Sequence, residues 1–107
     1  MEATSIPSLL ELVDVTEAST VSRTVVQDDR VKVVLFAFAA GQELSEHTAS
    51  VPAILHVLDG TAHVTLADQA IDAGPQTWVH MPAHLPHSIR AVTDVRMLLT
   101  LLRAPGA

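Results

Sequence analysis

The stretch VSRTVVQDDRVKVVLFAFAAG, residues 21–41, decides the fold class. Two runs rich in Val and other β-prone residues flank the polar group at 28–30, and the second run stops just before Gly41. The same pattern continues along the chain, where short apolar runs alternate with turn residues. Regularly spaced short strands of this kind are typical of an all-β sandwich or barrel.

The expected strands can be located from these runs. They cover residues 21–27, 31–39, 53–58, 61–66, 70–72, 77–81, 87–92 and 95–102. Asp59-Gly60 separates two of them, and this dipeptide favours a tight hairpin turn because both residues tolerate positive φ. We therefore expect the strands on either side of Asp59-Gly60 to pair with each other.

A chain of 107 residues is too short for two independent cores. We expect an N-terminal segment at 1–19 that packs on a barrel, a single domain at 20–103 and a tail at 104–107. Nearly half of the residues are apolar, but the core must be built from aliphatic side chains, because few aromatic residues are present. These aromatic residues are Phe36, Phe38 and Trp78.

Charge and composition restrict the partners. Twelve acidic against six basic residues give a net charge of −6, which repels nucleic acid phosphates and anionic lipid surfaces. No cysteine is present, so a metal would need imidazole, carboxylate or water ligands. Residues 1–13 lack the features of a secretory signal, and no apolar run approaches the roughly 20 residues that span a bilayer. We expect a cytoplasmic protein without nucleic acid or membrane partners.

All six histidines lie between Gly41 and Arg90, which indicates a site. A single strand histidine is more often a surface or hydrogen-bonded core residue than a ligand, so their number alone does not identify one. The positions are His47, His56, His63, His80, His84 and His87.

Two segments give the histidines a context. GQELSEHTASVPAILHVLDG, residues 41–60, and GPQTWVHMPAHLPHSIR, residues 74–90, resemble the two conserved motifs of the cupins, here small single-domain cupins of the RmlC-like superfamily. The first motif places its flanking glycines on Gly41 and Gly60 and its first histidine on His47. Its second histidine and its glutamate fall on Ala49 and Ala53.

The second motif, aligned on Pro82, also departs from the family pattern. It places its two glycines, its histidine and its asparagine on Gln76, His84, His87 and Ala91. Gly74 lies two residues upstream of Gln76 and is an alternative source of the turn. The resemblance covers roughly residues 20–102 and implies an antiparallel double-stranded β-helix, the jelly-roll barrel of cupins.

In cupins a metal ion is held inside the barrel, and the resemblance implies His47 and His87 as the remaining ligands. Metal sites usually have three or more protein ligands, so two imidazoles imply weaker binding or help from water or substrate. The implied cofactor is a divalent transition metal such as Zn, Fe, Mn or Ni.

Side chains alternate across a strand, so Ala53 shares a face with Leu55 and Val57, and His56 points out of the barrel. If Val79 and Met81 face inward, His80 also points out, and His56 and His80 form a cross-strand pair. A bulge that turns one of them inward is the alternative.

The other polar residues near the motifs have separate expectations. His84 is placed to reach the mouth of the pocket, and His63 is expected to face solvent. Glu43 shares the parity of His47 and is a candidate for an inward position, whereas Glu46 should point outward.

Three functions remain open. The first is a metal-dependent enzyme acting on a small organic substrate, the second is a metal-free small-molecule-binding or sensory cupin, and the third is a structural protein with a vestigial pocket. No nucleophile elbow or phosphate loop is present. A homodimer is expected through an outer apolar face, because such a patch is too large to remain in water. The face comprises Ile54, His56, Leu58, Trp78 and His80.

Overall fold

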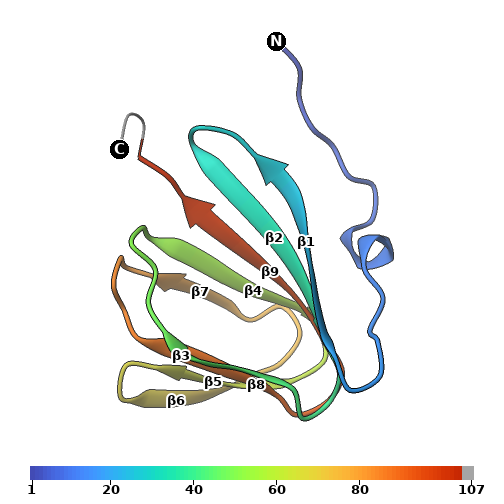
Figure 1. The fold of residues 1–107 in the computed structure, drawn as a ribbon, viewed down its shortest axis with the longest axis vertical. Coiled ribbons are helices and arrows are strands. Elements are labelled where there is room, and N and C mark those ends of the chain that lie inside the picture. The colour runs from blue at the N-terminus through green and yellow to red at the C-terminus, as the bar shows by residue number, and fades with distance from the viewer. Residues whose placement is uncertain (105–107) are drawn as a thin grey trace.

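The computed structural model describes residues 1–104, and it confirms the all-β prediction with two antiparallel sheets (Figure 1). The elements are η1 (Leu9–Leu12), β1 (Thr20–Gln27), β2 (Val31–Phe38), β3 (Glu43–His47), β4 (Ala53–Asp59), β5 (Ala62–Leu66), β6 (Gln69–Ala73), β7 (Trp78–Met81), β8 (His87–Ala91) and β9 (Val95–Leu102). One sheet has the order β1-β2-β9-β4-β7, and the other has the order β3-β8-β5-β6. This is the jelly-roll arrangement that the motifs imply.

The main core lies between the two sheets. Leu55 of one sheet and Val64 of the other are both fully buried in one apolar cluster with Met97. Burying an aliphatic side chain of this size contributes about 1.5–3 kcal/mol, so the facing surfaces hold the layers together. Side chains alternate along β2, because Phe36 and Phe38 pack in this cluster and Leu35 and Ala37 pack in a second cluster on the outer side of the sheet.

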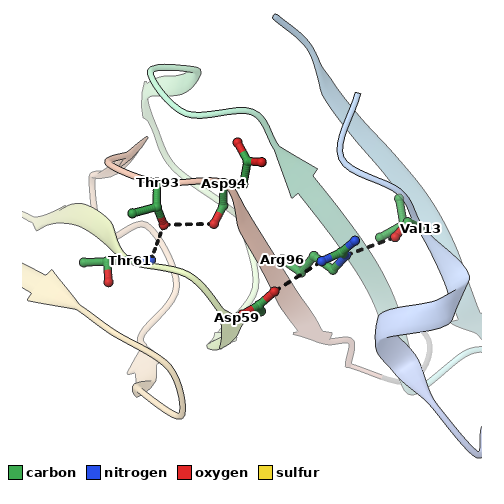
Figure 2. A network of polar contacts seen from close by, with 6 residues as sticks. All are labelled: Val13, Asp59, Thr61, Thr93, Asp94 and Arg96. Carbon is green, nitrogen blue, oxygen red and sulfur yellow. Dashed lines mark hydrogen bonds and ion pairs between the residues drawn. The ribbon is translucent and has the colours of Figure 1, made fainter. Parts of the chain in front are cut away.

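The N-terminal segment covers part of this outer side. Val13 is buried against Leu35 and Ala37. Arg96 fixes the segment, because its Nε donates to the carbonyl oxygen of Val13 at 3.1 Å and its Nη1 to Oδ2 of Asp59 at 3.2 Å (Figure 2). One guanidinium group therefore ties the segment before β1 to both β9 and β4.

The Asp59-Gly60 turn differs from the prediction. It links β4 to β5, which belong to different sheets and do not pair, so the expected hairpin is wrong. Gly60 has a φ of 84°, and an added Cβ would overlap the carbonyl oxygen of Asp94. Thr93 closes the corner, because its Oγ1 accepts from Thr61 N and donates to Asp94 O, each at 2.9 Å (Figure 2). The dipeptide makes a corner between sheets because its backbone packs against the turn before β9.

Backbone hydrogen bonds join the loops at one end of the molecule, which we call the rim. The bonds run from Arg103 N to Arg30 O, from Leu102 N to Pro52 O, from His84 N to Ala49 O and from Ala67 N to Pro86 O, at 2.7–2.9 Å. At the rim end, Leu66, Leu85 and Leu101 are partly buried, whereas Ala53, Met81 and His87 are buried. The rim end of the core therefore has both buried and partly buried members.

Two sequence expectations concern the ends and the membrane. Most of the tail expected at 104–107 lies outside the described residues, because only Ala104 of it is described. Over residues 1–104, no helix is both long enough and apolar enough to cross a bilayer.

Candidate functional site

A β-bulge in β3 shapes the site. The register with β8 pairs Glu43 with Arg90, Leu44 with Ile89 and His47 with His87. Two residues of β3, Ser45 and Glu46, therefore oppose the single residue Ser88. An extra residue of this kind reverses the alternation of side chains beyond it.

The bulge decides which side chains of β3 face the interior. Leu44 packs on the main core before the bulge, and His47 lies beside the inward-facing His87 after it. The inward position considered for Glu43 is wrong, because Glu43 is exposed and lies in register with the exposed Arg90. Glu46 is exposed, as expected. Without the bulge, Leu44 and His47 would lie on opposite faces of the sheet.

The structure brings His47 and His87 together at the rim end. Their ring centres are 4.2 Å apart, and the ring planes are inclined by 57°. His87 is 4% exposed, whereas His47 is open to solvent. The pair thus has one member embedded in the core and one that solvent reaches.

Each imidazole is oriented by a backbone carbonyl two residues earlier. Nδ1 of His47 lies 2.8 Å from Ser45 O, and Nδ1 of His87 lies 2.8 Å from Leu85 O. A carbonyl oxygen only accepts, so both Nδ1 atoms carry the proton and donate it. In the neutral rings the free lone pair is therefore on Nε2, the atom that can bind a metal ion or accept from a ligand.

The backbone supports the motif alignment even where the motif residues have changed. All four positions that carry glycine in the motifs have positive φ, whether or not they are glycine in this chain. The values are 87° at Gly41, 84° at Gly60, 73° at Gln76 and 68° at His84. Gly74 has no positive φ, so the alternative in which it supplies the turn is wrong.

The outer histidines follow the predicted parity. Ala53, Leu55 and Met81 belong to the interior cluster, so His56 and His80 point outward, and β4 and β7 are antiparallel neighbours as expected. The register contains no bulge that would turn either residue inward.

Their predicted cross-strand pairing is wrong. His56 lies opposite Trp78, and Ile54 lies opposite His80, so the two imidazoles are diagonal neighbours. Leu58, included in the expected apolar face, packs with the cluster around Val13. The part of the face outside that cluster, with Trp78 and His80 exposed and Ile54 and His56 half-buried, is therefore smaller than expected, and we call it the outer patch. It consists of Ile54, His56, Trp78 and His80.

The other two histidines have surroundings of their own. His84 is exposed on the rim, where its backbone N–H bonds to Ala49. His63 is half-exposed, with Nδ1 3.1 Å from Oδ1 of Asp72 on the neighbouring strand. Within residues 1–104, no group of three or more His, Cys, Asp or Glu side chains is placed to hold a metal ion. In the described part of the chain, the donor set is thus the imidazole pair alone.

Two facing antiparallel sheets, four left-handed motif positions and an imidazole pair at one end together define a small jelly-roll protein of the cupin class. The family model of the cupin domain matches residues 34–102, and the chain belongs to this family. No curated protein matches the chain.

Solved structures of similar size share this fold. A cupin superfamily protein from Desulfitobacterium hafniense is 32% identical with a TM-score of 0.86, and the match covers 97% of this chain and 94% of that one. An RmlC-like cupin from Desulfovibrio desulfuricans is 32% identical with a TM-score of 0.83, over 94% and 97% of the two chains. A conserved protein of unknown function from Streptococcus pyogenes is 26% identical with a TM-score of 0.87, over 99% and 93%.

Proposed function

We propose that this cupin binds a divalent transition metal ion through Nε2 of His47 and Nε2 of His87, and that the ion contacts a small organic molecule. The observation that supports this most directly is the pair of adjacent imidazoles whose Nδ1 atoms both donate to backbone carbonyls. Backbone anchoring of this kind fixes the tautomer and orients ligating histidines in metal sites. Imidazole suits Zn, Fe and Ni in particular.

The separation of the rings is compatible with one shared ion. A metal–imidazole bond of about 2.1 Å places the ion about 3.2 Å from each ring centre. Rings whose centres are 4.2 Å apart can therefore both reach the same ion. Two protein ligands leave coordination positions for water or for the small molecule.

The chain's own residues have three tasks in this proposal. The carbonyl groups of Ser45 and Leu85 hold the rings. The apolar side chains of the neighbouring core, Leu44 among them, shield His87 from water, whereas His47 stays open to solvent. A bound divalent ion would supply Lewis-acid polarisation of an oxygen atom of the small molecule.

Elemental analysis of tagless protein, purified without chelator, tests the proposal. We expect stoichiometric metal in the natural protein and its loss in a His47→Ala, His87→Ala double variant. The matched control is His56→Ala, His80→Ala, which removes two imidazoles from the outer side of the five-stranded sheet and should leave the metal content unchanged. Metal that persists in the His47 and His87 variant contradicts the proposal.

A metal-free binding site for a small molecule is the second candidate. The observation that favours it is the donor set, which among residues 1–104 does not reach three ligating side chains. In this form the two Nε2 atoms accept hydrogen bonds from the ligand. Absence of metal from both the natural protein and the His47 and His87 variant would favour this function over the first.

A further inference from the structure

Two cross-strand rows of side chains extend the outer patch from β7 across β4 and β9 to β2. Their members share the outer side of the five-stranded sheet, because side chains alternate along each strand, and none of them is Asp, Glu, Lys or Arg. They are His80, Ile54, Thr100 and Val33 in one row and Trp78, His56, Leu98 and Leu35 in the other. With neutral histidines, both rows are therefore uncharged from β7 to β2.

The outer side of the four-stranded sheet is built differently. One row across all four of its strands consists of Glu43, Arg90, His63 and Asp72. Nδ1 of His63 lies 3.1 Å from Oδ1 of Asp72, and the two outer members of the row and Arg90 are exposed. A row with charges of both signs is typical of a face that stays in water. Of the two outer faces, that of the five-stranded sheet gains more from being covered.

The N-terminal segment covers only the part of this face near β2. Val13 packs on Leu35, whereas neither apolar cluster within residues 1–104 includes Trp78, Ile54 or Val33. Trp78 lies on the edge strand β7 and is 59% exposed. The β7 side of the face is therefore available to a partner.

A second copy of the chain is the partner that this surface fits. The chain has a net charge of −6, so two copies repel each other least where they meet through uncharged side chains. A different, basic partner would be guided by acidic residues, which the two rows lack. A two-fold contact places the same patch on itself, and an uncharged patch meets itself without repulsion.

The size of the face indicates a weak dimer. Four strands lie about 4.8 Å apart, and the two rows, with Leu102 and Val31 beyond them, follow one another at about 7 Å. The face thus measures roughly 20 by 20 Å, or about 400 Å² per copy in projection, which is at the low end for specific complexes. A small change of charge at such an interface is enough to shift the equilibrium.

His56 and His80 supply this change of charge. They are diagonal neighbours, with Trp78 opposite His56 on β7 and Ile54 opposite His80 on β4. On its other side, His56 lies opposite Leu98 of β9. A neutral imidazole can be buried among such side chains, whereas an imidazolium would enter the interface with an uncompensated charge.

The charged groups on this side of the sheet are engaged elsewhere or exposed on the N-terminal segment. They are Arg96 and Asp59, which pair at 3.2 Å, Arg23, which donates to Leu12 O at 3.1 Å, and the exposed Glu11 and Asp14. Neither row that contains a histidine supplies a carboxylate.

We infer that the outer patch binds a second copy of this chain, and that protonation of His56 and His80 separates the two copies. The ordinary pKa of histidine is about 6.5, so the dimer should form above this pH and weaken as the pH falls below it. The overall charge predicts the opposite effect. Protonation of all six histidines would bring the net charge from −6 to zero and reduce the repulsion between copies.

Sedimentation equilibrium of the natural protein at pH 7.5 and pH 5.5 tests the inference. At pH 5.5 about one-tenth of free imidazoles are neutral, so each histidine that must be neutral weakens association about tenfold. A symmetric dimer contains each histidine twice, so Kd should rise at least about a hundredfold. Trp78 is the single tryptophan, so its fluorescence emission should shift to the red as the copies separate.

Variants assign the effect to the patch. The His56→Gln, His80→Gln double variant keeps polar side chains that do not titrate, and its Kd should be the same at both pH values. Each single variant should show a smaller pH response than the natural protein. The matched control is His63→Gln on the other sheet, which should respond to pH as the natural protein does. Trp78→Glu should be monomeric at both pH values.

The results can overturn each part of the inference. A natural protein that is monomeric at pH 7.5, or a dimeric Trp78→Glu variant, contradicts the surface. An equal or tighter Kd at pH 5.5 contradicts the effect of protonation. A full pH response in the double variant, or its loss in His63→Gln, contradicts the role of His56 and His80.

Discussion

Gln76 occupies a left-handed position that favours glycine, so Gln76→Gly should stabilise the protein. Its φ is 73°, and a residue with a Cβ in this region loses about 1–2 kcal/mol relative to glycine. Glycine in turn loses about 0.5–1 kcal/mol more backbone entropy on folding. The side chain of Gln76 is exposed, and its backbone N–H still donates to Val57 O at 2.8 Å after the substitution. The net expectation is a gain of about 0.5–1 kcal/mol in the free energy of unfolding.

Urea denaturation measures this gain. With a denaturant slope of about 1–2 kcal/mol per molar, the midpoint should rise by roughly 0.5 M. The matched control is Gln69→Gly, because Gln69 is also exposed but lies in β6 without positive φ, so that the same change should lower the midpoint. The reasoning is refuted if both substitutions destabilise the protein equally.

Three further predictions follow from other parts of the structure. Gly41→Ala should lower the free energy of unfolding by about 1–2 kcal/mol, because Gly41 has positive φ. Gly60→Ala should lower it further, because at Gly60 the new Cβ also overlaps the backbone of Asp94. Equal urea midpoints for the two variants would contradict this. The protein should sediment at equilibrium as a homodimer at micromolar concentration, and Trp78→Glu in the outer patch should make it monomeric; a monomeric natural protein contradicts this. Hydrogen bonds from the backbone N–H of Arg30 and, to a smaller extent, of Val31 hold the pKa of Asp28 below its ordinary value. The ionised carboxylate therefore stabilises the fold at neutral pH, and this contribution is lost as the pH falls through the lowered pKa. Asp28→Asn should therefore lower the urea midpoint at pH 7 and have less effect near pH 3, and an equal effect at both pH values would argue against it.

The strands were predictable because their alternation and turn residues are local. Most expected ranges agree with the structure, including 21–27 and 95–102, which match β1 and β9 within one residue. The hairpin at Asp59-Gly60 was not predictable from the dipeptide. Positive φ at Gly60 serves a corner between sheets as well as a hairpin, and the packing against Asp94 that decides between them is 34 residues away in sequence.

The motif alignment was predictive beyond the residues that match. Gln76 and His84 stand where the motif has glycine, and their backbones have the positive φ that glycine would favour at these positions. The turn geometry is set by the surrounding contacts, such as the bond from His84 N to Ala49 O at 2.7 Å. Contacts of this kind hold a strained residue in place after the glycine has gone.

Side-chain parity failed only in β3, and the reason bears directly on the site. Strict alternation predicts Glu43 and His47 on the same face of β3. The two residues between Leu44 and His47 oppose a single residue of β8, however, so the faces are exchanged beyond this bulge. The bulge turns His47 inward and also positions the Ser45 carbonyl, which accepts from Nδ1 of His47. Inward placement and tautomer of His47 thus have one common cause. Deletion of Glu46, which removes the bulge, should therefore turn the imidazole of His47 away from His87. It should also remove the Ser45 carbonyl contact that keeps the proton on Nδ1 and leaves Nε2 free to bind.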